Sequence, residues 1–237
     1  MVRSATDPAL VREQYAREDR LRARRELYEE VRGENAPDVL WRALEERRPR
    51  SVLEVGGGPG ELAERIVMEL GADLVFVDQS QRMVDLARGR NLDARVGDVQ
   101  ALPFAGGSFD TVVAAWMLYH VDDIDRALAE IARVLKADGA LFAATNSVHH
   151  LSELEDLIAM DVGSLVRQFS RENGEELLRR HFAEVDRIDV ETEVIVRDRA
   201  KLVAYQQSLS TPSRPVPEDV SLPFVVHGRS SIFVATR

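Results

Sequence analysis

The sequence predicts an α/β fold in which parallel strands alternate with helices. An apolar run over residues 51–55 enters a glycine turn at residues 56–60, and a helical pattern follows over residues 61–70. Segments typical of strands and helices then alternate at the spacing of βα units up to about residue 145. With 237 residues the chain can bury a complete core, so one domain with additions is expected.

Local signals place the elements in order. Asp7 followed by Pro8 is typical of a helix start, and an apolar stripe continues this helix to about Val31, before Gly33. A second helix is expected over residues 37–47. The remaining elements are strands at 51–55, 73–77, 94–97, 109–114, 140–145, 184–196 and 230–236, and helices at 61–70, 81–88, 124–135 and 199–209. Residues 147–180 have a mixed helical pattern, and residues 211–224, with four prolines, are expected to form a surface loop.

Composition excludes several kinds of protein. The net charge of −10 disfavours generic binding to nucleic-acid phosphates, so no nucleic-acid partner is expected. There is no cysteine, and therefore no disulfide, thiolate metal site or cysteine nucleophile. The longest apolar run, residues 112–119, is far shorter than a membrane span, and residues 1–8 contain no apolar segment typical of a signal peptide. We therefore expect a cytoplasmic protein that does not enter a membrane.

The glycine spacing after the first of these strands indicates the type of ligand. Gly56, Gly58 and Gly60 form G-x-G-x-G, and Glu54 stands two residues before the first glycine. A dinucleotide-binding G-x-G-x-x-G counted from Gly56 would need glycine at position 61, which is Glu61. Because glycine has no Cβ, such a turn lets the backbone approach a ligand closely.

Asp78 ends the next strand, 18 residues after Gly60. A carboxylate at this place can accept hydrogen bonds from both hydroxyls of a ribose. A nicotinamide enzyme would also place an acid here, so Asp78 alone does not choose the cofactor.

Further candidates follow the next strands at the same edge of the sheet. Asp98 and Val99 come directly after residues 94–97, and Ala115 follows residues 109–114. Ligands of open α/β sheets bind at the carboxyl ends of the strands. Asp98 could also serve only to cap a turn.

These four segments, in this order, resemble class I S-adenosylmethionine (SAM)-dependent methyltransferases of the small-molecule type common in bacteria. The resemblance covers residues 51–145. It implies a Rossmann-like sheet of seven mostly parallel strands, with an antiparallel last strand and helices on both faces. It also implies SAM as cofactor and S-adenosylhomocysteine (SAH) as product.

The resemblance assigns roles to particular residues. The glycine turn would hold the methionine half of SAM, Asp78 its ribose, and Asp98 with the Val99 amide its adenine. Met83 would pack near the adenine or ribose, although it could equally be helix core. The full set implied for the cofactor is Glu54, Gly56, Gly58, Gly60, Asp78, Gln79, Met83, Asp98, Val99, Ala115 and Tyr15. Tyr15 would cover the methionine end, and its alternative role is packing within an amphipathic helix.

Methyl transfer from a sulfonium needs a nucleophile held in line and protected from water. The motifs of DNA amino methylation and of RNA ribose methylation are missing, and no acid follows strand 109–114 to start a magnesium site. No metal ligand is therefore predicted. A base, if one is used, is expected among the histidines. His120 follows strand 109–114, and His149 and His150 follow strand 140–145, all at the ligand edge, whereas His227 before the last strand is the weakest candidate. His120 and His149 are taken as catalytic candidates. Tyr119 is the third catalytic candidate; each of the three could instead be a wall or surface residue.

The predicted organisation is an N-terminal helical arm or lid over residues 1–50 and a SAM-binding domain over residues 51–237. Insertions at about 147–173 and 198–228 would cap the substrate. The predicted function is metal-independent methyl transfer to an oxygen or nitrogen of a small-molecule acceptor, by a monomer or homodimer. A SAM-binding regulator without turnover would keep the same motifs, and an NAD(P)-dependent oxidoreductase is a third, less favoured class.

Overall fold

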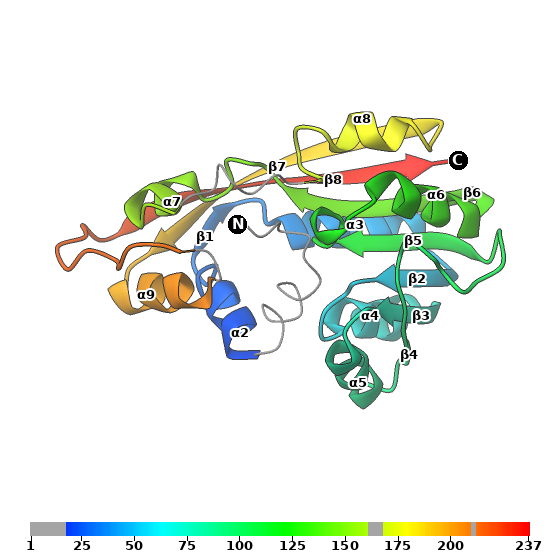
Figure 1. Ribbon diagram of the computed structural model, residues 1–237, viewed down its shortest axis with the longest axis horizontal. Helices are drawn as coiled ribbons and strands as arrows, with labels where there is room; N and C mark the ends of the chain where they lie inside the picture. Colours follow the sequence, from blue (N-terminus) through cyan, green and yellow to red (C-terminus); the bar gives the residue numbers. More distant parts are fainter. Residues whose placement is uncertain (1–17, 161–167, 210–211) are drawn as a thin grey trace.

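The computed structural model describes residues 18–160, 168–209 and 212–237, whose strands form one sheet with helices on both faces (Figure 1). The eight strands lie in the order β1-β7-β8-β6-β5-β2-β3-β4. They are β1 (Val31–Gly33), β2 (Ser51–Val55), β3 (Asp73–Asp78), β4 (Asp93–Val96), β5 (Phe109–Ala115), β6 (Leu135–Asn146), β7 (Glu184–Val196) and β8 (Phe224–Thr236).

The helices connect and cover these strands. They are α2 (Glu18–Glu26), α3 (Ala36–Arg47), α4 (Glu61–Arg65), α5 (Gln81–Gly89), α6 (Ile124–Val134), α7 (Ser152–Leu157), α8 (Gly174–Arg179) and α9 (Arg199–Ser208). A π-helical turn, η1 (Ile66–Leu70), extends α4, and a 3₁₀ turn, η2 (Leu118–His120), follows β5. The helices predicted over residues 37–47, 61–70, 81–88, 124–135 and 199–209 are therefore present, with ends within one residue of the prediction when η1 is counted with α4.

The strand directions confirm the predicted fold class. β4, β3, β2, β5 and β6 are parallel, whereas β8 runs antiparallel between β6 and β7. The sheet has eight strands instead of seven because residues 31–33, predicted as the end of a helix, pair antiparallel with residues 192–194 of β7. The helix before them ends at Glu26, and the β-branched Val31 can then join the sheet edge.

The second boundary that differs is the start of β8. It begins at Phe224, six residues before the predicted start at 230, because β8 pairs with the whole of β7 from Val196 to Glu184. Cross-strand pairing therefore extends β8 at its start, beyond the residues that the local pattern indicated.

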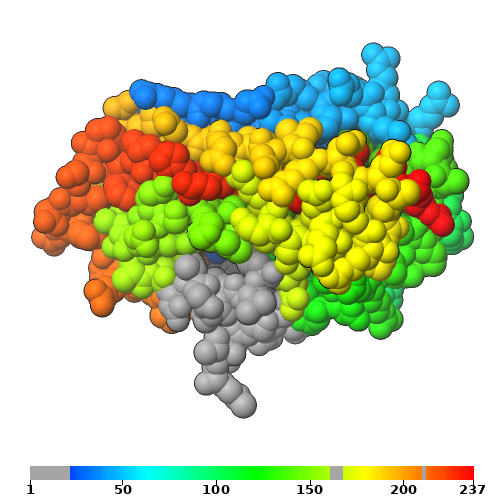
Figure 2. All heavy atoms as spheres, turned by 90° about the horizontal axis from the view of Figure 1, so that it is seen from above, coloured from blue at the N-terminus to red at the C-terminus, as the bar shows by residue number. Residues whose placement is uncertain are grey.

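Parallel strands buried on both faces place successive side chains in opposite layers. Val112 of β5 packs in the layer that contains α6 and α8, and its neighbour Val113 packs in the layer that contains α3 and α5. Seen from above, α8 and the first part of β7, in yellow, lie across the middle of one face, with the orange segment before β8 at one end (Figure 2). This rigid sheet fixes the positions of the loops at its edge.

A third cluster of buried apolar side chains lies beyond the two main layers. It joins the turn after α2 with α7, α9 and the adjoining parts of β7 and β8, through Leu27, Leu151, Leu154, Ile158, Val194, Val196, Leu202, Val216 and Val226. α2 packs beside α9 (Figure 1). The segments outside the parallel core thus form a packed unit of their own next to the sheet.

Candidate active site

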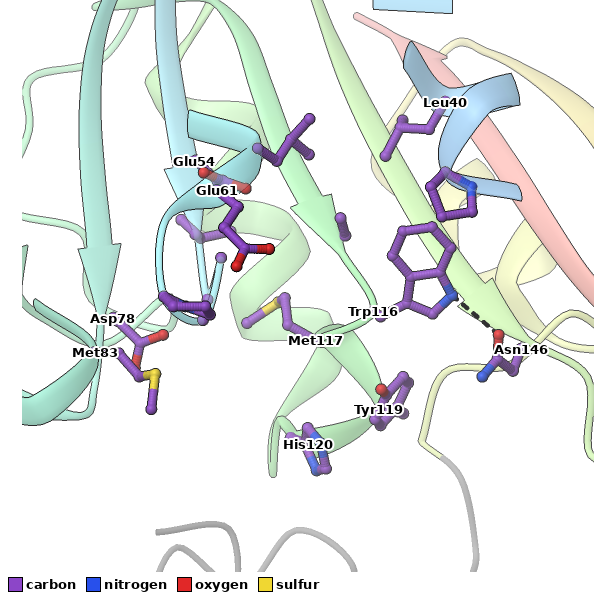
Figure 3. Close-up of a pocket in the computed structure, with 18 of the residues that line it drawn as sticks. Leu40, Glu54, Glu61, Asp78, Met83, Trp116, Met117, Tyr119, His120 and Asn146 are labelled. Carbon is purple, nitrogen blue, oxygen red and sulfur yellow. Dashed lines mark hydrogen bonds between the residues drawn. The ribbon is translucent and has the colours of Figure 1, made fainter. Parts of the chain in front are cut away.

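A cavity of about 860 Å³ opens where the parallel strands end. The last residues of β2, β3, β5 and β6 line it, namely Val55, Asp78, Ala115 and Asn146. This is the edge at which open α/β sheets bind ligands, and the volume lies in the upper part of the range of roughly 300–1,000 Å³ for small-molecule pockets. The cavity is therefore the candidate active site (Figure 3).

The glycine turn is shaped by close contacts on one side and open space on the other. A Cβ on Gly56 would lie 2.9 Å from the side chain of Met117, and a Cβ on Gly57 would lie 2.4 Å from the Glu54 carboxyl. Gly58 has a φ of +59° and lines the cavity, and a Cβ on it would meet no atom within 4 Å. The backbone at Gly58 is therefore bare toward the cavity, as a ligand-binding turn requires.

Gly60, the third glycine of the motif, has a different neighbourhood. Its φ is +79°, and a Cβ would lie 3.0 Å from Leu92 and 3.1 Å from Ala87. Gly60 starts α4, whose first turn thus approaches α5 closely. The structure therefore places Gly60 at a helix-packing contact, while Gly56 and Gly58 line the cavity.

Glu54 is a buried carboxyl at the cavity, with only 1% of its surface exposed. Its Oε2 has no hydrogen-bond partner among the described residues. Burial, with a smaller contribution from the charge of Asp78, raises the pKa of Glu54 to about 8, against the opposing effect of the Ala63 N–H. A donor or cation in the cavity would satisfy this oxygen, because a buried acceptor without a partner is costly.

Asp78 ends β3 and lies beside Met83 on the same side of the cavity (Figure 3). Its Oδ1 accepts a 2.8 Å hydrogen bond from the Ser80 N–H, and the Gly58 N–H also donates to the carboxyl. Burial raises the pKa of Asp78 to about 6 although these two N–H groups lower it. Asp78 thus ties the glycine turn to the end of β3, and Gln79 continues the lining.

Asp98 and Val99 follow β4 and line the same cavity. The Asp98 Oδ1 accepts a 2.9 Å hydrogen bond from the Gln100 N–H, so this carboxylate also caps its turn. The capping role considered from sequence is therefore present together with a position on the cavity wall. Val99 is buried, as is Met83.

The opposite wall contains an ordered group of polar side chains after β5 and β6. The indole Nε1 of Trp116 donates a 2.9 Å hydrogen bond to the Oδ1 of Asn146, and the Ser230 hydroxyl donates to the same oxygen at 2.9 Å. Trp116 has a φ of +53°, which is uncommon for an aromatic residue and marks a strained turn. Ala115, which was also expected at this edge, lines the cavity as well.

Tyr119 and His120, two of the catalytic candidates, both line the cavity. Within η2 their ring centroids lie 4.4 Å apart in an edge-to-face arrangement. His149, the third candidate, is exposed, whereas the adjacent His150 lines the cavity and contacts the Tyr28 hydroxyl at 2.7 Å. The structure thus brings His150 into the site instead of His149, because the chain turns sharply between β6 and α7.

The arm reaches the glycine-turn side of the cavity through one ion pair. Arg25 of α2 lies 2.6 Å from the Glu61 carboxylate at the start of α4, and both residues line the cavity. Tyr28, just after α2, and Thr192 of β7 also line the cavity, from segments without a sequence motif. Tyr15, the predicted cover of the cofactor, lies outside the described residues.

Within residues 18–160, 168–209 and 212–237, no group of three or more His, Cys, Asp or Glu side chains has the arrangement of a metal site. In the same ranges, none of the helices has the length and apolar character needed to cross a bilayer.

Comparisons with known proteins point to one family. The family model described as a methyltransferase domain matches residues 53–143. A malonyl-[acyl-carrier protein] O-methyltransferase of Pseudescherichia vulneris is 33% identical over 119 residues, which cover 49% of this chain and 47% of that protein. A ubiquinone/menaquinone biosynthesis C-methyltransferase UbiE of Geotalea uraniireducens is 30% identical over an alignment of 155 residues, which covers 56% of this chain and 66% of that protein. The chain thus spans about half to two thirds of the length of these curated relatives.

Solved structures agree in fold. The YcgJ protein of Bacillus subtilis superposes with a TM-score of 0.60 at 19% identity, covering 85% of this chain and 99% of that one. At this identity the likeness extends to the fold alone. The two curated relatives are named for different acceptors and for different atoms methylated, so similarity leaves the acceptor open.

Proposed function

Because the chain belongs to the class I SAM-dependent methyltransferases, we propose that it transfers the methyl group of SAM to a small-molecule acceptor without a metal ion and releases SAH. The nucleophile in this proposal is an oxygen or a nitrogen. The proposal rests on one continuous cavity. The glycine turn, Asp78 and Asp98 line one side of it, and Trp116, Asn146 and His120 line the other. A cofactor and a small acceptor could therefore meet in the same space.

The residues on the glycine-turn side fit SAM. Gly58 offers bare backbone, and Glu54 offers a buried oxygen that needs a donor, as an ammonium group would supply. Asp78 would hold the ribose hydroxyls while its N–H contacts keep the turn in place. Asp98 and Val99 would hold the adenine, and Met83 would pack against it.

SAM supplies an electrophilic methyl group on a sulfonium, so the protein's task is to place the acceptor and exclude water. Trp116, Tyr119 and His120 give the second wall an aromatic character, and Asn146 adds a polar group. A pocket with these walls suits a small acceptor with an apolar body and few polar atoms.

We also propose that residues 1–50 act as an arm over the cavity and that segments 147–173 and 198–228 cap the acceptor. The third apolar cluster supports this, since it joins the turn after α2 with α7 and α9. The ion pair between Arg25 and Glu61 supports a contact of the arm with the glycine turn. Such a cover would have to open for SAM to enter and SAH to leave.

The test combines binding and turnover in one preparation. Calorimetry with SAH and SAM should show binding, and NADH should show none. Turnover of SAM with a panel of hydroxyl and amine acceptors should persist in EDTA. Binding without turnover of any acceptor would favour the regulator alternative, and activity lost in EDTA and restored by Mg²⁺ would contradict the metal-independent mechanism.

A further inference from the structure

Two residues distant in sequence form a hydrogen-bonded pair on the cavity wall. Tyr28 follows α2 and His150 precedes α7, and both line the cavity. The Tyr28 hydroxyl lies 2.7 Å from Nε2 of His150, and the two rings stack with an interplanar angle of 26°. A phenol and an imidazole in this contact can exchange a proton.

The other ring nitrogen of His150 is held by β8. Nδ1 lies 3.0 Å from both the backbone oxygen and the backbone nitrogen of Arg229. The carbonyl accepts from a protonated Nδ1, and the N–H donates to an unprotonated one, so both neutral tautomers have a partner. With Nδ1 protonated, Nε2 is the acceptor for the Tyr28 proton, and the imidazolium that forms keeps both of its hydrogen bonds.

This arrangement defines a route for a proton from the cavity. Since Arg229 holds Nδ1 and Tyr28 holds Nε2, a molecule in the cavity reaches the ring through the Tyr28 hydroxyl. A tyrosine hydroxyl can donate one hydrogen bond while it accepts another. Burial, and to a lesser extent Tyr205, raises the pKa of Tyr28 well above its ordinary value, so this side chain passes a proton on and stays neutral.

The charged groups of the surrounding elements have partners of their own. The Arg229 guanidinium donates to the backbone carbonyl of His149 and lies 3.4 Å from Glu153 of α7 and 3.7 Å from Glu191 of β7. Arg24 of α2 donates to Ser208 of α9. His227 of β8 contacts the same Glu153. An anion in the cavity could pair with an imidazolium at His150, and also with Arg24, which lines the same cavity.

The strand that holds His150, β8, also holds an N–H donor, the side-chain amide of Asn146. Ser230 follows Arg229 in the chain and donates to the Asn146 Oδ1, as Trp116 also does. The amide nitrogen of Asn146 points away from Trp116, to the side of Tyr119 (Figure 3). The cavity thus offers a proton acceptor, His150, and an N–H donor, Asn146, whose partners Arg229 and Ser230 are adjacent in β8. This suits an oxygen that becomes negatively charged.

We propose that the acceptor carries an ionisable hydroxyl, as a phenol or enol does, and that Tyr28 passes the hydroxyl proton to His150 during methyl transfer. This inference rests on the proposed function. The hydroxyl oxygen forms a bond to the methyl carbon as the S–CH₃ bond breaks, and the bonding electron pair stays on the sulfur of SAH. The hydroxyl proton moves to the Tyr28 oxygen while the Tyr28 proton moves to Nε2. The positive charge of the sulfonium therefore ends on the His150 imidazolium.

The probe for this step is 4-nitrophenol, which absorbs visible light as the phenolate. It is added to the SAH-loaded protein, and the apparent pKa of the bound probe is read from its absorbance. Wild-type protein should lower this pKa by roughly one unit, a tenfold change in the ionisation constant, by pairing the phenolate with the imidazolium. Tyr28→Phe and His150→Gln, which keep the size of each side chain approximately, should bind the probe without this shift.

Controls separate a proton relay from a structural contact. SAH affinity and thermal stability are measured for every variant, and His181→Gln, a histidine that pairs with Asp125 on the outer surface, is the matched histidine control. A probe that binds without a pKa shift, an equal shift in all variants, or no binding of the probe to SAH-loaded wild type would each overturn the inference. Failure of wild type to bind SAH would instead overturn the proposed function itself.

Discussion

The indole N–H of Trp116 decides which end of the Asn146 amide faces the cavity. An indole nitrogen can only donate, so the atom 2.9 Å away must be the amide oxygen. The Ser230 hydroxyl donates to the same oxygen. The two N–H groups of Asn146 are thus presented as fixed donors, which a surface asparagine would not provide.

Asn146→Asp should impair methyl transfer more than binding of the cofactor. The carboxylate still accepts from Trp116, but it offers the cavity an oxygen where Asn146 offers N–H groups. We expect kcat/KM with the best acceptor of a hydroxyl panel to fall at least tenfold, about 1.4 kcal/mol, while SAH affinity in calorimetry stays the same. Trp116→Phe, which frees the amide to rotate, should give a smaller loss. Unchanged kcat/KM in both variants would show that the amide does not contact the acceptor.

Asp78→Ala should weaken SAH binding by about 2 kcal/mol or more, because the ribose hydroxyls lose their acceptor and the N–H groups of Ser80 and Gly58 lose theirs. The matched control is Asp73→Ala, at the exposed start of the same strand. Calorimetry with SAH measures both variants. Equal affinities for the two would remove Asp78 from the cofactor site.

Glu54→Gln should change how stability depends on pH. Because the folded protein holds the Glu54 proton more tightly than the unfolded chain, the stability of the wild type should fall as the pH rises from about 4.5 to about 8. Each pKa unit corresponds to about 1.4 kcal/mol, and glutamine, which does not ionise, removes this loss. The free energy of unfolding, measured in urea on either side of that pH window, should increase for the variant relative to wild type at high pH. If stability changes with pH in the same way for wild type and Glu54→Gln, as we expect for the exposed Glu45→Gln, then Glu54 is not buried in its neutral form.

Arg25→Glu tests the contact between the arm and the glycine turn. The substitution places two acidic side chains together where Arg25 now pairs with Glu61. Since the pair is about half exposed, the loss of SAH affinity should stay within about 1 kcal/mol. The double variant Arg25→Glu with Glu61→Arg should restore affinity. If the single variant binds SAH like wild type at low salt, the pair does not hold the arm over the cofactor.

Deleting residues 1–32 would remove more than a cover over the cavity. It would remove Leu27, which is buried in the third apolar cluster, and most of β1. Single substitutions such as Arg25→Glu are therefore the sharper test of a lid.

The part of the site that lies in consecutive βα units was predictable from sequence. Glu54, Asp78 and Asp98 each stand at or just after a strand, and parallel strands bring these positions to the same edge. The extent of β7 was predicted residue for residue, and its buried positions alternate from Val190 to Val194. Local patterns suffice where the chemistry follows directly from one strand and its turn.

The acceptor side could not be predicted in the same way. Whether His149 or His150 faces the cavity depends on an irregular turn, where no periodicity indicates the direction of a side chain. Tyr28 and Thr192 belong to segments whose position depends on pairing between distant strands, as the unforeseen β1 also does. The cytoplasmic location and the choice between monomer and homodimer stay predictions.

The antiparallel insertion of β8 between β6 and β7 has a consequence for the order of folding. The cofactor side needs only neighbouring units of the chain, whereas Tyr28 meets His150 across 122 residues and His150 meets Arg229 across 79. Closing such long loops costs more chain entropy and slows the formation of these contacts. The nucleotide-binding half should therefore gain amide protection first in pulsed hydrogen exchange, and the wall that selects the acceptor should be completed last. A folding intermediate between these two stages would bind SAH but would lack the wall that selects the acceptor.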